Sequence, residues 1–153
     1  MTSSAFGFEQ PEQSPGFLLW QVSVIWQRRI RLLLDQHGLS HAQFVLLAIL
    51  LWCEEQTISP IQSYLVKQSK LDKMTVSAGL NKLCHSKLIV RETDAVDTRA
   101  KVAKLTSTGR ILIKRLIPQI EQIDRDFFAK LGQTEQQKIV SALHQLVSLS
   151  DDS

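Results

Sequence analysis

The sequence predicts a mainly helical protein that contains one small β-hairpin. Apolar residues recur at helical spacing along most of the chain, which indicates amphipathic and buried helices. The period changes only over residues 88–105, where two short stretches rich in apolar and β-branched residues flank a polar segment. With 153 residues, of which 44% are hydrophobic, the composition allows one compact domain with an appended assembly segment.

The first part of the chain predicts a polar leader and two helices. Residues 1–15 lack apolar periodicity, and we expect them to be loose. Apolar residues at helical spacing predict a first helix within residues 16–37, and Gly38 ends the pattern. Ser40 is expected to cap a second helix that runs to about Trp52. This second helix is apolar almost all round, which is typical of the buried centre of a domain.

Two short helices and a hairpin are predicted in the middle of the chain. The first helix covers residues 61–68, and Asp72 caps the second after a tight turn. The hairpin has strands at residues 88–93 and 101–105. Helices of this length around a tight turn, with a hairpin behind them, predict a winged helix-turn-helix domain over residues 38–105.

The rest of the chain, residues 106–150, predicts two more helices. Thr106 caps a long helix, which Pro118 is expected to kink because proline removes one backbone donor. Gly132 ends it, and Thr134 caps a last helix whose buried stripe contains Ile139, Leu143 and Leu146. Together with the N-terminal helix, these helices are more apolar than one small domain can cover, so they are expected to pair with other helices.

The positive charge of the chain lies in its middle third. The net charge is +3 overall, but it is −2 over residues 1–56, +5 over residues 57–105 and zero over residues 106–153. A basic segment between neutral or acidic ones suggests a polyanion as partner for that segment. On charge alone, an ordinary solvated surface is an equal alternative.

Several short motifs occur in a specific order along the predicted domain. They are Leu71-Asp72-Lys73-Met74-Thr75-Val76-Ser77, Leu80, Leu83, Leu88-Ile89, Arg91, Asp97-Thr98-Arg99, Leu105-Thr106 and Gly109. In this order and spacing the chain resembles the multiple antibiotic resistance regulator (MarR) family of bacterial transcription factors, over roughly residues 17–149. The sequence departs from the family at Ala78, where a basic or polar contact residue is frequent, and at Lys87, where glycine is frequent.

The helix after Asp72 is predicted to read DNA in the major groove. Val76, Leu80 and Leu83 are expected to face the core, and the opposite face presents Lys73, Thr75, Ser77, Ala78, Asn81 and Lys82. Hydroxyl, amide and cationic groups can reach base edges and phosphates. The alternative is an ordinary amphipathic surface helix. Cations suited to phosphate contacts, or simply to solubility, are Lys67, Lys70, Arg91, Lys101 and Lys104.

Arg99 is the sharpest candidate for a contact made by the hairpin. A hairpin tip can enter the minor groove, whose negative potential suits arginine. Asp97 can pair with the guanidinium and hold it extended. In the alternative, Asp94 and Asp97 only form the turn, and Arg99 is solvated. The resemblance favours the DNA-reading role.

The resemblance also implies a homodimer and an effector. In the family, the N- and C-terminal helices interleave with those of a second subunit. A two-fold dimer then binds double-stranded DNA at an inverted repeat. Family members often bind a small aromatic or phenolic molecule beside these helices. The candidates here are Trp20, Trp26, His41, Phe44 and Trp52, although aromatics at helical spacing are more often plain core.

Other functional classes find little support. The longest apolar run, residues 44–53, is ten residues long, about half of a membrane-spanning helix. The leader shows no signal peptide, and Cys53 and Cys84 cannot form a disulfide framework, so we expect a cytoplasmic protein whose thiols are structural. His37 and His41 are separated by Gly38 and the Ser40 cap, so they do not share a helix face as metal ligands.

The chain lacks a phosphate loop, a nucleophile elbow and paired catalytic carboxylates, so we expect no enzyme, metal or cofactor. The sequence therefore predicts a ligand-responsive, sequence-specific transcription regulator, most simply a repressor. The remaining alternative is a winged-helix module that binds only protein. Such a module predicts neither the basic excess near the hairpin nor its Asp-x-Arg tip.

Overall fold

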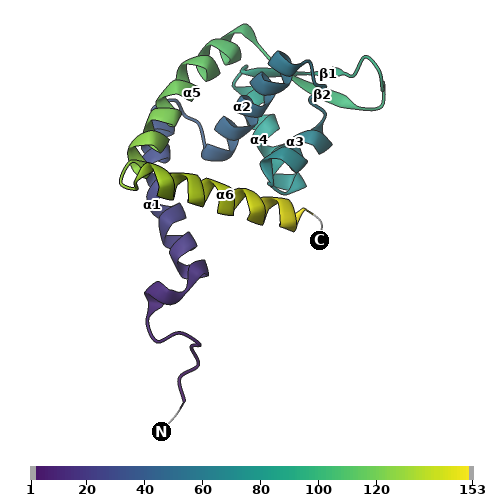
Figure 1. Cartoon of the computed structure of the whole chain (residues 1–153). Coiled ribbons are helices and arrows are strands. Elements are labelled where there is room, and N and C mark those ends of the chain that lie inside the picture. The colour runs from purple at the N-terminus through teal and green to yellow at the C-terminus, as the bar shows by residue number, and fades with distance from the viewer. Residues whose placement is uncertain (1–2, 152–153) are drawn as a thin grey trace. The chain divides into compact units, whose positions relative to one another are not determined.

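A computed structural model describes residues 3–151 of the chain (Figure 1). Positions 1 and 2 of the expected leader lie outside the described residues. The elements follow one another as a 3-10 turn at Pro11–Gln13, α1 (Pro15–Asp35), α2 (His41–Gln56), α3 (Gln62–Ser69), α4 (Lys73–His85), β1 (Ile89–Thr93), β2 (Lys101–Leu105), α5 (Ser107–Phe128) and α6 (Gln133–Ser150). The fold is mainly helical with one hairpin, as predicted.

The chain divides into two compact units, and the boundary falls directly after Pro118. The first unit therefore contains α1 together with the helix-turn-helix and the hairpin, and the second begins within α5. α5 continues through Pro118 as one helix.

The core of the first unit is built around α2. This helix packs against α1, α3, α4 and β2. Its side chains at Leu46, Leu47 and Cys53 are fully buried, which agrees with the apolar character expected of a central helix. Thr57 ends the helix in the left-handed conformation, so that α2 runs one turn beyond the expected end at Trp52.

The hairpin is antiparallel and is anchored at its base. Ile89 pairs with Leu105 and Thr93 with Lys101, so the loop between the strands projects from the far end (Figure 1). Val102 also forms a bridge with Ile61, which ties the hairpin to the start of α3. This bridge fixes the hairpin relative to the helix-turn-helix.

Side-chain caps start α2, α4 and α5 where the sequence predicts them. The Ser40 hydroxyl accepts from the backbone N–H of Gln43 at 3.1 Å, and the Gln43 side chain accepts in return from the Ser40 N–H at 2.9 Å. The Thr106 hydroxyl accepts from the Gly109 N–H at 3.0 Å. For α6 the expected cap at Thr134 is wrong, because the helix begins at Gln133 with Gly132 at the N-cap.

Two residues near the base of the hairpin lie where the backbone geometry favours glycine. A Cβ atom at Gly109 would overlap the carbonyl oxygen of Leu88, the residue before β1. The start of α5 therefore comes so close to the backbone at Leu88 that only glycine fits. Lys87 has a φ of 59°, in the left-handed region that favours glycine. A glycine at this position would adopt the turn with less strain than the lysine found here.

In the second unit, α6 has an apolar stripe but no buried residue. Leu143 is 40% and Leu146 59% exposed, so the expectation that this stripe is buried is wrong for a single chain. Among the described residues, no helix combines the length and the apolarity needed to cross a membrane.

Candidate nucleic-acid interface

The α4 helix begins with a strong cap. The Asp72 carboxylate accepts from the Thr75 backbone N–H at 2.8 Å and from the Thr75 hydroxyl at 2.6 Å. These bonds, led by the one from the hydroxyl, lower the pKa of Asp72 below its ordinary value. The Thr75 hydroxyl, a candidate DNA contact, is therefore already engaged in the cap, although its oxygen can still accept a bond.

The α4 helix has one buried face and one exposed face, as the sequence predicts. Val76, Leu80 and Leu83 are at most 2% exposed and form the inner face. Outside this inner face, Lys73, Ala78, Asn81 and Lys82 are exposed, and Thr75 and Ser77 are half-buried. The polar candidates on α4 therefore lie outside its buried face, with Lys73 and Lys82 about 180° apart around the axis on either side of Asn81.

Met74 belongs to this surface, and sequence reasoning missed it as a contact. It is 83% exposed in the first turn of α4. With 3.6 residues per turn, it lies within about 40° of Ala78 around the helix axis. The signal was present in the sequence, since Met74 lies opposite the buried pair Val76 and Leu80 on a helical wheel.

The tip of the hairpin is shaped by its own side chains. Asp94 accepts from the Ser59 hydroxyl at 3.1 Å and from the Asp97 backbone N–H at 3.1 Å. Asp97 accepts from the backbone N–H of Arg99 at 3.0 Å and from its Nε at 3.4 Å. The expected ion pair is present, and both aspartates also form the turn, while the DNA-reading role of Arg99 stays a prediction.

The Arg99 side chain is 92% exposed while its guanidinium is held by Asp97. An exposed cation on an ordered loop is suited to enter a groove of negative potential. Its alignment by a carboxylate reduces the side-chain freedom that binding would otherwise remove.

The cations around the hairpin are not equivalent. Arg91 and Lys101 are exposed on the two strands, as are Lys67 and Lys70 near the end of α3. Lys104 instead forms an ion pair with Glu92 at 2.8 Å. The hydrogen bond and the negative charge of Glu92 raise the pKa of Lys104. Lys104 is therefore a weaker candidate for phosphate than the sequence suggested.

Comparison with known proteins identifies the family. Residues 35–123 match a family model described as an ArnR1-like winged-helix domain. The chain is 33% identical over 140 residues to the uncharacterised HTH-type transcriptional regulator YdcH of Bacillus subtilis (strain 168), covering 92% of this chain and 94% of that protein. BpsR of Bordetella bronchiseptica is 26% identical with a TM-score of 0.81, covering 92% and 97% of the two chains. A MarR-family regulator from Rhodococcus sp. RHA1 is 20% identical with a TM-score of 0.79, covering 92% and 96%.

The chain belongs to the MarR family. It is a transcriptional regulator of the winged-helix type, and the resemblance stated from its motifs is confirmed. The matched region contains α2 to β2, so the family assignment covers both α4 and the hairpin, which is the wing of this fold.

The residues expected to line an effector pocket come from α1 and α2. Trp26 and His41 meet edge to face with ring centroids 5.3 Å apart, and Phe44 is buried on α2, three residues after His41. Trp20 is 67% exposed and Trp52 is 55% exposed. Trp26 and His41 are half-buried and Phe44 is buried, and the effector site stays a prediction.

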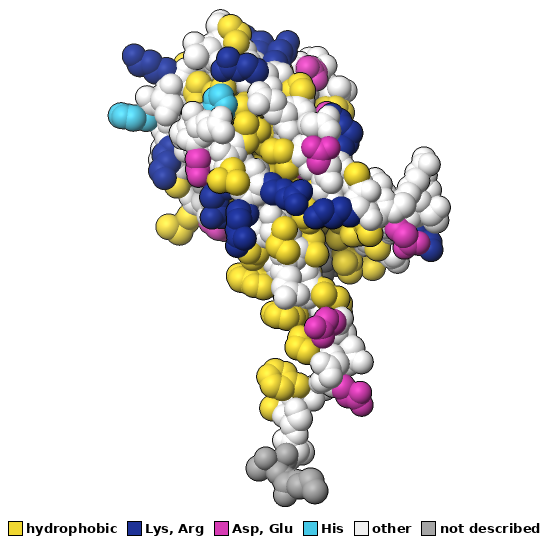
Figure 2. Space-filling view, turned by 90° about the vertical axis from the view of Figure 1, so that its left-hand side faces the viewer, with side chains coloured by type: hydrophobic (Ala, Val, Ile, Leu, Met, Phe, Trp, Pro, Cys, Tyr) yellow, Lys and Arg dark blue, Asp and Glu magenta, His cyan; other side chains and the backbone are white. Residues whose placement is uncertain are grey.

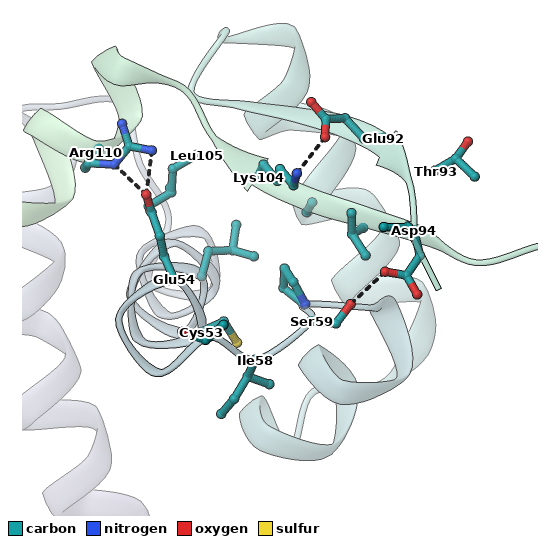
Figure 3. Close-up of a pocket in the computed structure, with 16 residues that line it drawn as sticks. Cys53, Glu54, Ile58, Ser59, Glu92, Thr93, Asp94, Lys104, Leu105 and Arg110 are labelled. Carbon is teal, nitrogen blue, oxygen red and sulfur yellow. Dashed lines mark hydrogen bonds and ion pairs between the residues drawn. The ribbon is translucent and has the colours of Figure 1, made fainter. Parts of the chain in front are cut away.

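A cavity of about 640 Å³ lies elsewhere in this MarR-family regulator, between the end of α2 and the wing (Figure 3). None of the five expected effector residues lines it. Its rim carries the Glu54–Arg110 ion pair at 2.7 Å and the Ser59–Asp94 hydrogen bond. On its floor, burial raises the pKa of the Cys53 thiol, which disfavours the reactive thiolate. Among the described residues, no cluster suited to a metal ion is present.

Proposed function

We propose that the protein binds double-stranded DNA sequence-specifically, with α4 in the major groove and Arg99 in the minor groove. One observation carries the proposal: both elements belong to one compact unit. The first is a capped helix with a mainly polar outer face, and the second is a loop in which Asp97 aligns the exposed Arg99. The proposed contacts are Lys73, Thr75, Ser77, Asn81, Lys82, Arg91, Asp97, Arg99 and Lys101, with Asp97 acting through Arg99.

We further propose that the protein acts as a homodimer on an inverted repeat. α1 exposes a large apolar surface that includes Leu18, Val22 and Ile25. Figure 2 shows hydrophobic side chains along this helix, in the lower part of the view. Contiguous exposed apolar patches mark interaction sites, and a two-fold pair places two α4 helices on one face of the duplex.

The proposed regulation is release from DNA by a small aromatic or phenolic effector, which would make the protein a repressor. BpsR is described as a protein whose DNA binding is regulated by 6-hydroxynicotinic acid. In this chain the proposed contacts are Trp20, Trp26, His41 and Phe44.

A protein whose partner is chromosomal DNA acts in the cytoplasm of a bacterium, and this location stays a prediction.

The decisive experiment is selection of bound fragments from a random double-stranded DNA pool by the purified full chain. We expect an enriched inverted repeat whose half-sites are about one helical turn apart. The matched control is Asn81→Ala, which leaves the inner face of α4 intact and should relax the preference at one position in each half-site. A pool without enrichment would favour the alternative, a winged-helix module that binds only protein.

A further inference from the structure

We infer that Met74 and Ala78 recognise thymine, by contact with its C5-methyl group in the major groove. The inference rests on the proposed DNA binding through α4 and adds the base that this helix prefers. Met74 is 83% exposed, and Ala78 follows it one turn later on the same helix. The two side chains lie on the same side of the helix because residues four apart differ by only about 40° in direction.

The pair lies near the centre of the outer face of α4. The inner face of the helix is centred on Val76, Leu80 and Leu83, all buried. Met74 and Ala78 lie on the opposite side, toward the middle of the outer face rather than at its border with the core. Met74 contributes nothing to the core, so packing of this unit does not explain an apolar side chain at position 74.

Exposed polar side chains surround the pair. Lys73 and Lys82 are exposed to either side of it, and Asn81 is exposed about 20° from Met74 around the axis. Lysines flanking a helix face suit the two phosphate backbones that border a groove. A protein partner with a wide apolar surface would leave these cations opposite apolar groups, whereas the floor of a major groove meets the centre of the face alone.

The chemistry of the two side chains then selects the base. Neither methionine nor alanine offers a strong hydrogen-bond donor, so neither can read the acceptors of guanine or adenine. Thymine is the base that presents an apolar group, its C5-methyl, in the major groove. The flexible and polarisable methionine side chain adapts to such a methyl group. Asn81 beside it can form a bidentate pair with adenine. The outer face of α4 is therefore suited to A·T base pairs.

The test replaces single thymines by deoxyuridine in the selected operator, at symmetric positions of both half-sites. This change removes only the methyl group. For the parent chain we expect one or two positions where affinity falls about threefold to fivefold per methyl, which is the effect of exposing one buried carbon. For Met74→Ala, the deoxyuridine penalty at one of these positions should fall below about twofold, since the methyl would no longer have its partner.

The matched control is Met74→Leu, which keeps an apolar side chain of similar volume at the same position and should keep the parental pattern of penalties. The inference is overturned if no thymine of the operator shows a penalty with the parent chain, or if Met74→Ala shows the same penalties as the parent. These outcomes are separate from failure of the proposed function, because that failure appears earlier, as absence of any enriched operator.

Discussion

The helices α1 and α4 are both amphipathic, but they use their apolar residues in opposite ways. α4 buries Val76, Leu80 and Leu83 and exposes mainly polar side chains. α1 buries only Ile30 and Leu34, near its end, and leaves apolar side chains exposed along most of its length. A helix of the first kind is complete within one chain, whereas a helix of the second kind needs a further surface. The part of the molecule proposed to meet DNA is therefore distinct from the part proposed to meet a second subunit.

The largest expected effect is loss of the dimer when apolar residues of α1 are replaced. Replacing Leu18 and Ile25 together by glutamate should abolish the dimer, because two charges per subunit would be buried without partners. The helical content should be retained, since glutamate favours helix. Sedimentation of the purified variant measures the change. The control is Met74→Glu on α4, which should remain dimeric. A full-length parent that sediments as a single monomeric species would contradict the proposal.

The next effect tests the claim that α4 is complete within one chain. Leu80→Ala removes a side chain that is 2% exposed and should lower the free energy of unfolding by about 2–5 kcal/mol. Met74→Ala, earlier on the same helix, should change it by less than about 0.5 kcal/mol. Denaturant unfolding of both variants at one protein concentration makes the comparison. Equal decreases would show that Met74 packs in the folded protein.

A third prediction concerns the wing. Arg99→Ala should weaken operator binding by about tenfold or more, because the arginine is removed from both subunits. The dependence of log K on log salt should flatten by about one unit for each phosphate that is no longer neutralised. The control is Arg99→Lys, which keeps the charge and should keep the salt dependence. The melting temperature should not change, since this side chain is exposed. Parental affinity of Arg99→Ala at every salt concentration would exclude the wing from the interface.

The smallest effect is a pH dependence at the start of α4. The pKa of Asp72 is lower in the folded chain than in the unfolded one, so its cap stabilises the fold above the unfolded pKa and is lost as the pH falls through the folded value. Asp72→Ala should therefore lower the melting temperature at pH 7 and by a smaller amount near pH 3. Asp72→Asn, which still caps, should show a small difference at both values. Thermal scans at the two pH values measure it, and a constant gap for Asp72→Ala would contradict the assignment.

Much of the fold and part of the interface can be predicted because their signals are local. The caps at Ser40 and Asp72 depend on a side chain and a backbone N–H three residues later, and the structure contains both. The inner face of α4 follows from helical periodicity. The pairing of Asp97 with Arg99 also joins neighbours, and the structure contains it.

The interactions that the sequence does not predict join segments far apart in the chain. The close approach of Gly109 to Leu88 arises where the start of α5 packs against the hairpin. The neutralisation of Lys104 by Glu92 depends on the register of the two strands. The stripe on α6 is exposed rather than buried, because a pattern of apolar residues shows that a face seeks a partner but does not say on which chain the partner lies.

The sequence alone thus determined the order of the elements, most of the caps, the inner face of α4 and the family. These features depend on residue types within a turn or two of one another, where the periods of helix and strand act directly. The tertiary structure alone decided that Lys104 pairs with Glu92 and how closely the start of α5 approaches the residue before β1. These features depend on which surfaces meet, because packing buries one set of side chains and leaves another for the partner.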